Sequence, residues 1–428
     1  MRDDSSGGGV AMHVRDLATV QPGYVLGKTV YTERGDVLLA EGTVLTQVYI
    51  DALRLRNFLT IHVEDGLSDD VRPNDIVSEQ VRARTAAHVA RMFDIVAVTA
   101  GVAPGRGSSG SPPDGATADD LGDRTLVLPS AGMSMLEALY KDIERIMYEI
   151  LDSNAVSSLE SLKTHSDYTF EHSVEVAIVA IMLGKNLGLP NSQIRELALG
   201  ALLHDIGKIY VDPAILNKPG KLDPHEFDEI KKHPLLGFEL VRRLPLFSTL
   251  PAHVAYQHHE KQDGTGYPRK LVGNNRILRL EAERLRPTRI LLIAEIAAVA
   301  DVFCALASAR PYKPAFPMDQ VAQMMRTMSG GHLNRDVVNA LLSTVPLYAI
   351  GHWIEVVSGP YHGWRGVVTH VEPATLHAPS IRLHLDARRN EVAVPVELDL
   401  RRHTDYRLVC LPPGEAPQAA PTERREIS

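Results

Sequence analysis

The chain of 428 residues has little cysteine, since Cys304 and Cys410 are its only two and lie far apart. Two distant cysteines give no disulfide framework, so we expect a reduced, cytoplasmic compartment. The N-terminus carries Asp3 and Asp4 and no apolar segment, which argues against a secretory signal peptide. The formal net charge of -8 provides no overall basic field, so we expect no nucleic-acid polymer as partner.

The chain also lacks a long apolar run free of charge. Its most membrane-like stretch, residues 289–307, carries Glu295 and Asp301 in the middle, and both would be costly in lipid. We therefore expect a helix buried within protein and no membrane contact. Apolar residues make up 44% and charged residues 23% of the chain, as in soluble globular proteins.

The pattern of the sequence changes from β-rich to helical and back again. Short apolar runs broken near Gly35 and Gly42 predict hairpins close to the N-terminus. In the middle, apolar residues at every third or fourth position predict helices. After Tyr348 the runs alternate and turn at glycine and asparagine. The predicted fold is therefore multidomain, with an all-α domain between a small N-terminal β-module and a small C-terminal antiparallel β-domain.

The same patterns predict the boundaries of these parts. They are a disordered N-terminus at 1–11, a β-rich module at 12–73, a helical connector at 74–100, a flexible insertion at 101–125, the helical domain at 126–345, the β-domain at 346–411 and a disordered tail at 412–428. The insertion is rich in Gly, Ser, Pro and Asp, a composition that cannot bury a core.

Histidines and carboxylates recur within the helical part. The candidates for metal ligands are His172, His204, Asp205, His233, His258, His259 and Asp301. A single histidine is more often a surface residue or a cap, but this set of nitrogen and oxygen ligands suits two first-row transition metals. Asp205 directly follows His204 and can bridge two ions, which could share a hydroxide and clamp both oxygens of a phosphoryl displacement. Asp301, inside an apolar helix, must be paired or bound to metal.

Three motifs in order, "HDIGK", "HHEKQDGTGYP" and "ADVF" followed by "RPYK", resemble the HD-GYP family of the HD phosphohydrolase superfamily. The resemblance runs from about Asp167 to Pro314. It implies a helical phosphodiesterase that opens the bacterial second messenger cyclic di-GMP to pGpG or GMP, with iron or manganese as cofactor.

The resemblance also implies a role for individual residues. The ligands of one ion would be His172, His204, Asp205 and Asp301. The ligands of the other would be Asp205, His233, His258 and His259. The catalytic residues would be Asp205 and Lys208. The substrate-binding residues would be Lys208, Gly266, Tyr267, Pro268, Arg310 and Lys313.

The sequence departs from the family pattern at several positions. Tyr168 stands where some members have a glutamate that recruits a third ion, so we expect two ions. Cys304 replaces an aspartate, and we expect a small buried residue there rather than a soft ligand. Glu295 reverses a charge, and residues 279–289 resemble an insertion.

Two other interpretations of the helical domain stay open. It could be a non-catalytic sensor of a cyclic dinucleotide, or a hydrolase of another cyclic dinucleotide. The N-terminal module resembles one that often precedes HD-GYP domains, which implies a regulatory role. A second copy of the chain or another signalling protein is a candidate partner.

Overall fold

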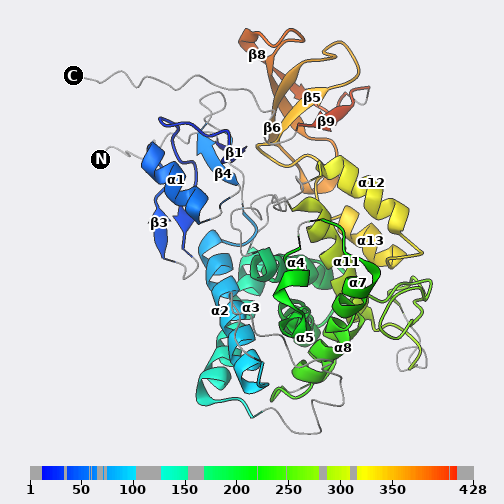
Figure 1. Cartoon of the computed structure of the whole chain (residues 1–428). Helices are drawn as coiled ribbons and strands as arrows, with labels where there is room; N and C mark the ends of the chain where they lie inside the picture. The colour runs from blue at the N-terminus through cyan, green and yellow to red at the C-terminus, as the bar shows by residue number, and fades with distance from the viewer. Residues whose placement is uncertain are drawn as a thin grey trace, which may run out of the picture.

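The computed structural model describes residues 12–32, 36–56, 58, 60–64, 71, 75–102, 127–152, 168–218, 220–246, 248–278, 287–308, 316–403 and 405–411. The predicted disordered ends at 1–11 and 412–428 lie outside these residues, as does most of the predicted insertion. Along the described chain, a small β-module is followed by a helical domain and then by a C-terminal sheet (Figure 1).

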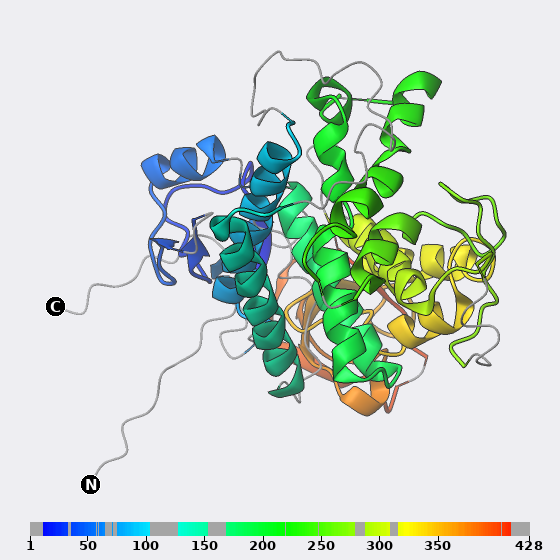
Figure 2. The same ribbon diagram turned by 90° about the horizontal axis from the view of Figure 1, so that it is seen from below.

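The N-terminal module contains two small antiparallel sheets. β1 (Met12–Asp16) pairs with β4 (Thr60–Glu64), and β2 (Val30–Tyr31) pairs with β3 (Val37–Leu39). The pairing of β2 with β3 confirms the predicted hairpin. Figures 1 and 2 both place this module (blue) beside α2 (Glu79–Thr99), which contacts β2.

One helix of this module, α1 (Gln47–Leu55), was not part of the β-rich prediction. Its first turn is capped by Thr46, whose hydroxyl accepts a hydrogen bond from the backbone N–H of Tyr49 at 3.3 Å. Ile50 and Leu53 face the core of the module. The helix is only nine residues long, so its apolar positions are too few to show a helical period.

Helices make up the middle of the described chain. After α2 they are α3 (Ser130–Asp152), α4 (Tyr168–Asn186), α5 (Asn191–Leu203), the 3₁₀ helix η2 (Ile206–Tyr210), α6 (Pro213–Leu216), α7 (Pro224–Ile230), α8 (His233–Val241), α9 (Leu250–Gln257), α11 (Leu292–Ala307), α12 (Met318–Met328) and α13 (Arg335–Leu342). The last of them ends at Leu342, where the helical pattern of the sequence also ends.

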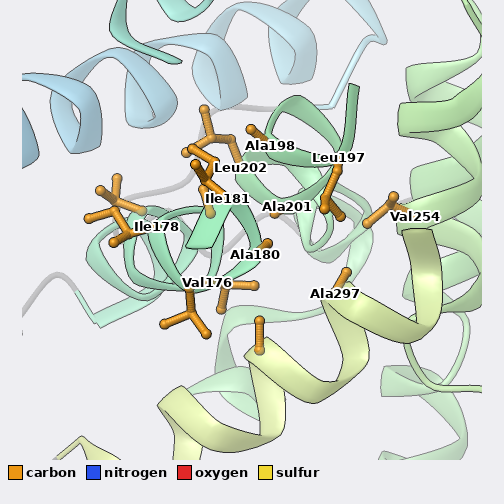
Figure 3. Close-up of a cluster of buried hydrophobic side chains, with 14 of the residues drawn as sticks. Val176, Ile178, Ala180, Ile181, Leu197, Ala198, Ala201, Leu202, Val254 and Ala297 are labelled. Atoms are coloured by element: carbon orange, nitrogen blue, oxygen red, sulfur yellow. The ribbon is translucent and has the colours of Figure 1, made fainter. Parts of the chain in front are cut away.

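The core of the helical domain forms around α4 and α5, which pack against each other and against α11, and α5 also packs against α9. Ile181 of α4 and Leu202 of α5 are buried there, and Ala297 of α11 lies close by (Figure 3). Burying a side chain of this size stabilises a fold by about 1.5–3 kcal/mol. Helices that are apolar on nearly every side belong in the centre of a domain, so α4 and α11 hold His172 and Asp301 on a rigid frame.

The stretch that looks most like a membrane segment is the buried helix α11. It packs against α4, α5, α9, α12 and α13, which confirms the prediction of a helix enclosed by protein. Among the described residues, no helix combines the length and the apolar character needed to cross a bilayer.

The C-terminal part is a five-stranded antiparallel sheet, which confirms the predicted small antiparallel β-domain (Figure 1, orange to red). Its strands are β5 (Trp353–Val356), β6 (Arg365–His370), β7 (Ser380–Leu385), β8 (Glu391–Asp399) and β9 (Leu408–Cys410), in the order β8-β7-β6-β5-β9, with the short 3₁₀ helix η3 (Pro373–Thr375) between β6 and β7. The hydroxyl of Tyr348 donates to the carbonyl of Leu408 at 2.9 Å, and α12 contacts β9. The sheet thus adjoins the helical domain on the side of α12.

Gly207 of η2 allows the close approach of η2 to α8. A β-carbon at this position would lie 2.0 Å from the carbonyl oxygen of His233 and 2.6 Å from the nitrogen of Gly237. We expect Gly207→Ala to push α8 away and to lower the free energy of unfolding by about 1–3 kcal/mol, measured by urea denaturation.

Gly237→Ala is the matched control, because its β-carbon would meet no atom closer than 3.4 Å. This variant should keep the stability of the wild type or exceed it slightly, since alanine favours a helix. Equal stability of the two variants would contradict the importance of the contact between η2 and α8.

Candidate metal centre

Seven side chains that are distant in the sequence meet between α4, α5, α8, α9 and α11. They are His172 on α4, His204 and Asp205 after α5, His233 at the start of α8, His258 and His259 after α9, and Asp301 on α11. The ligand atoms of His172, His204 and Asp301 all lie within 4.8 Å of one another, and so do those of His233, His258 and His259. The sequence prediction named all seven, and the fold brings all seven together.

Asp205 lies between the two groups. Its Oδ2 is 3.3 Å from Nε2 of His204, and its Oδ1 is 3.3 Å from Nε2 of His233. One oxygen therefore faces each group, which is the arrangement that a bridging carboxylate needs. On the outer side of the first group, Nε2 of His172 lies 2.9 Å from Oδ1 of Asp301.

The orientation of three imidazole rings is set by the backbone. His204, His233 and His258 each donate from Nδ1 to the carbonyl of the residue three positions earlier, at 2.7, 2.6 and 2.9 Å. In the neutral ring such a bond fixes the tautomer, so that Nε2 is the atom that can bind a metal. In all three residues Nε2 points toward Asp205, at 3.3 to 3.9 Å.

Burial determines the charge of the second group. It lowers the pKa of His233 and of His259 to about 3, and it holds the pKa of His258 well below its usual value. These rings are neutral at pH 7, which is the form that binds metals. Burial would also lower the pKa of His204, but the charge of Asp205 outweighs it and raises that pKa.

The carboxylate of Asp205 stays ionised although it is buried. Burial alone would raise its pKa, but the positive charges of His204 and Lys208 outweigh this effect and hold the pKa well below its usual value. Lys208 lies in η2, and its Nζ donates to Oδ2 of Asp205 at 2.5 Å. About a third of the Lys208 side chain is exposed, so it faces both the ligand cluster and solvent.

The Gly-Tyr-Pro turn lies directly against the histidines. The ring of Tyr267 stacks on that of His259, with centroids 4.8 Å apart and 28° between the planes. Burial, followed by the charges of Asp205 and Asp301, raises the pKa of the Tyr267 phenol, which therefore stays protonated. At Gly266 a β-carbon would lie 2.4 Å from the nitrogen of Lys261, so this tight turn requires glycine.

The segment that carries this turn is held in place by two buried carboxylates. Glu260 accepts hydrogen bonds from the backbone N–H groups of Arg269 at 2.7 Å and Leu271 at 2.8 Å, which closes the loop on itself. Glu295 of α11 accepts from Nε2 of Gln262 at 2.9 Å and from Nδ2 of Asn334 at 2.8 Å. Glu295 thus joins the loop to α11 and to the start of α13.

The structure accounts for two departures from the family pattern. The charge reversal at Glu295 supplies the buried acceptor for two side-chain amides, and only 2% of this residue is exposed. Cys304 is fully buried in α11, and burial together with Glu175 raises the pKa of its thiol well above the usual value. Among the described residues, Cys304 belongs to none of the candidate ligand groups, which agrees with a packing role.

Some features of the site escaped prediction, and others cannot be placed. Gln262 and Asn334 were missed as partners of Glu295 because they lie 33 and 39 residues away from it. The predicted substrate contacts Arg310 and Lys313 lie outside the described residues, as do residues 279–286 of the predicted insertion.

Comparison with known proteins agrees with this geometry. Residues 146–337 match the family model of the HD domain and include all seven converging side chains. These matches support the resemblance of the helical domain to the HD-GYP family.

Three curated proteins illustrate the likeness. The chain is 37% identical over 268 residues to a cyclic di-GMP phosphodiesterase of Pseudomonas aeruginosa, covering 61% of this chain and 59% of that protein. It is 34% identical over 209 residues to a cyclic di-GMP phosphodiesterase of Thermotoga maritima, covering 48% and 51%. It is also 34% identical over 213 residues to 3′3′-cGAMP-specific phosphodiesterase 3 of Vibrio cholerae, covering 49% and 41%. The chain thus spans about half the length of these curated relatives.

The hydrogen bond between Gln262 and Glu295 can be tested by exchanging the two side chains. In Glu295→Gln, one amide group must face another, and in Gln262→Glu two carboxylates meet in a buried place. We expect each single variant to lower the free energy of unfolding by about 1–3 kcal/mol.

The double variant Gln262→Glu with Glu295→Gln should recover most of this loss. Gln at 295 can still accept from Asn334 and donate to Glu at 262, which can still accept from the N–H of Asn275. Urea unfolding of all four proteins gives the coupling energy. If the double variant lost as much free energy of unfolding as the two single variants lose together, this result would contradict the network.

Proposed function

We propose that the HD-GYP domain is a metal-dependent phosphodiesterase that hydrolyses cyclic di-GMP to pGpG or GMP. The observation that carries this proposal is the pair of adjacent ligand groups with Asp205 between them. The two relatives that are cyclic di-GMP phosphodiesterases support the choice of substrate.

The donor set fits two first-row transition-metal ions, because it consists of imidazole nitrogens and carboxylate oxygens in two neighbouring groups. As proposed ligands of one ion we assign His172, His204, Asp205 and Asp301. As proposed ligands of the other we assign Asp205, His233, His258 and His259. We propose iron or manganese as the metal. Two bound ions would supply a nucleophile of lowered pKa and neutralise charge on the phosphoryl oxygens.

The side chains around the ligands have their own tasks in this proposal. Lys208 donates to a non-bridging oxygen of the scissile phosphate and stabilises the charge that develops there. The protonated hydroxyl of Tyr267 can donate to the substrate, and Gly266 and Pro268 form the pocket wall beside it. Arg310 and Lys313 are proposed to contact the nucleotide.

A second candidate substrate is another cyclic dinucleotide. The relative from Vibrio cholerae that is specific for 3′3′-cGAMP favours this candidate. The metal ligands and Lys208 would act on a phosphate, which every cyclic dinucleotide contains. The choice among bases must therefore come from residues beyond the ligand cluster. Parallel assays with cyclic di-GMP and 3′3′-cGAMP decide between the two candidates.

Replacing the proposed bridging residue should remove both metal and activity. We expect Asp205→Ala to bind fewer ions after anaerobic loading with iron or manganese, and to lose at least about a hundredfold in turnover of cyclic di-GMP. Metal analysis and product chromatography measure the two effects. The control is Asp51→Ala, which removes an exposed carboxylate of α1 and should change neither.

Each other outcome has a definite meaning. Full turnover by Asp205→Ala would refute the proposed mechanism, and three ions per site would refute the prediction of two. Two bound ions with tight binding of cyclic di-GMP but no hydrolysis would identify a sensor instead of an enzyme.

The role of Lys208 predicts a different pattern of loss. Lys208→Met should lower kcat about a hundredfold to a thousandfold, while the metal content stays that of the wild type. Lys221→Met, at an exposed position, is the control and should keep full activity. If Lys208→Met lost its metal or kept the kcat of the wild type, the proposal that Lys208 stabilises charge on the phosphate would be wrong.

A further inference from the structure

An exposed aromatic ring stands at the edge of the candidate metal centre. Phe227 of α7 exposes 46% of its surface. Its ring centroid lies 6.5 Å from that of Tyr267, with 80° between the planes, and Tyr267 in turn stacks on His259. Single exposed apolar residues are common and need no explanation. The position of Phe227 is different, because these three rings lead from a proposed metal ligand out to solvent.

The helix α7 is stabilised locally at its start and is tied to the metal centre at its end. At its start, Asp223 and Glu226 form a capping box, and Lys218 donates to Glu226 at 2.6 Å. At its end, the carbonyl of Ile230 accepts the hydrogen bond from Nδ1 of His233 at 2.6 Å. Phe227 lies three residues before this carbonyl, so its backbone keeps a set distance from the ligand cluster.

Charged side chains flank the exposed ring. Nζ of Lys231 lies over one face of the Phe227 ring, 5.1 Å from its centroid, and 2.5 Å from Oδ1 of Asp228. Lys231 and Asp228 are both partly open to solvent.

We propose that Phe227 is the stacking platform for a purine base of the substrate. The proposal rests on the proposed function, since it assumes a dinucleotide whose phosphate lies at the metal centre. Stacking increases with the area of the base, so the platform favours purines over pyrimidines. The platform thus supplies a preference among bases. Asp205 and Lys208 cannot supply it, because they act on the phosphate.

The test is calorimetric binding of cyclic di-GMP to the metal-loaded full chain, with Lys208→Met as a common background that slows turnover. We expect Phe227→Ala to weaken binding about tenfold to a hundredfold and Phe227→Trp to preserve it. The pyrimidine analogue cyclic di-UMP should bind more weakly than cyclic di-GMP, and Phe227→Ala should narrow that difference. With Lys208 present, Phe227→Ala should raise KM and leave kcat nearly unchanged.

Tyr148→Ala serves as the matched control, because Tyr148 is an exposed aromatic residue of α3 with 65% of its surface accessible. It should alter neither binding nor metal content, and both alanine variants should melt at the temperature of their parent. Rescue by tryptophan separates stacking from a general effect on folding.

The outcomes distinguish the platform from the proposed function. Unchanged affinity of Phe227→Ala for cyclic di-GMP would overturn the platform and leave the phosphodiesterase standing. The protein with Lys208 intact could also bind cyclic di-GMP through Phe227 and yet hydrolyse no cyclic dinucleotide. This result would support the platform and overturn the proposed activity. A chain that binds no purine dinucleotide would overturn both.

Discussion

The buried carboxylate of Asp205 is the constraint on which the helical domain depends. An ionised group with 3% exposure is costly unless it is paired, and its partners come from separate segments. His204 precedes it at the end of α5, His233 begins α8, and Lys208 lies in η2. The domain must therefore bring these segments together at one point, and the close approach of η2 to α8 at Gly207 follows from that requirement.

The helix α11 links the metal centre to the wall of the pocket. It carries Asp301, which faces His172, and Glu295, which holds Gln262 and the start of α13. Both carboxylates lie on a helix that is otherwise apolar and packed into the core. A single rigid element thus sets the distance between the ligand cluster and the loop that ends in the Gly-Tyr-Pro turn. This explains why a charge inside the apolar stretch is tolerated at each position.

Recognition of phosphate and recognition of base are separated in space in the proposed enzyme. The buried ligand cluster and Lys208 are proposed to act on the phosphate group, which all cyclic dinucleotides contain. The rings of Tyr267 and Phe227 extend from the ligand cluster toward solvent, and Phe227 is proposed to stack on the base.

The sequence by itself determined the features that depend on local patterns and on motifs. The apolar run that carries Glu295 and Asp301 predicted a buried helix, and alternation predicted the C-terminal sheet. The recurring histidines and carboxylates of the helical part gave the seven side chains that meet. Only the tertiary structure decided that Glu295 binds Gln262 and Asn334, and that Phe227 stands beside Tyr267. The physical reason is that such contacts join residues 33 to 40 positions apart, and no period in the sequence records which distant side chains meet.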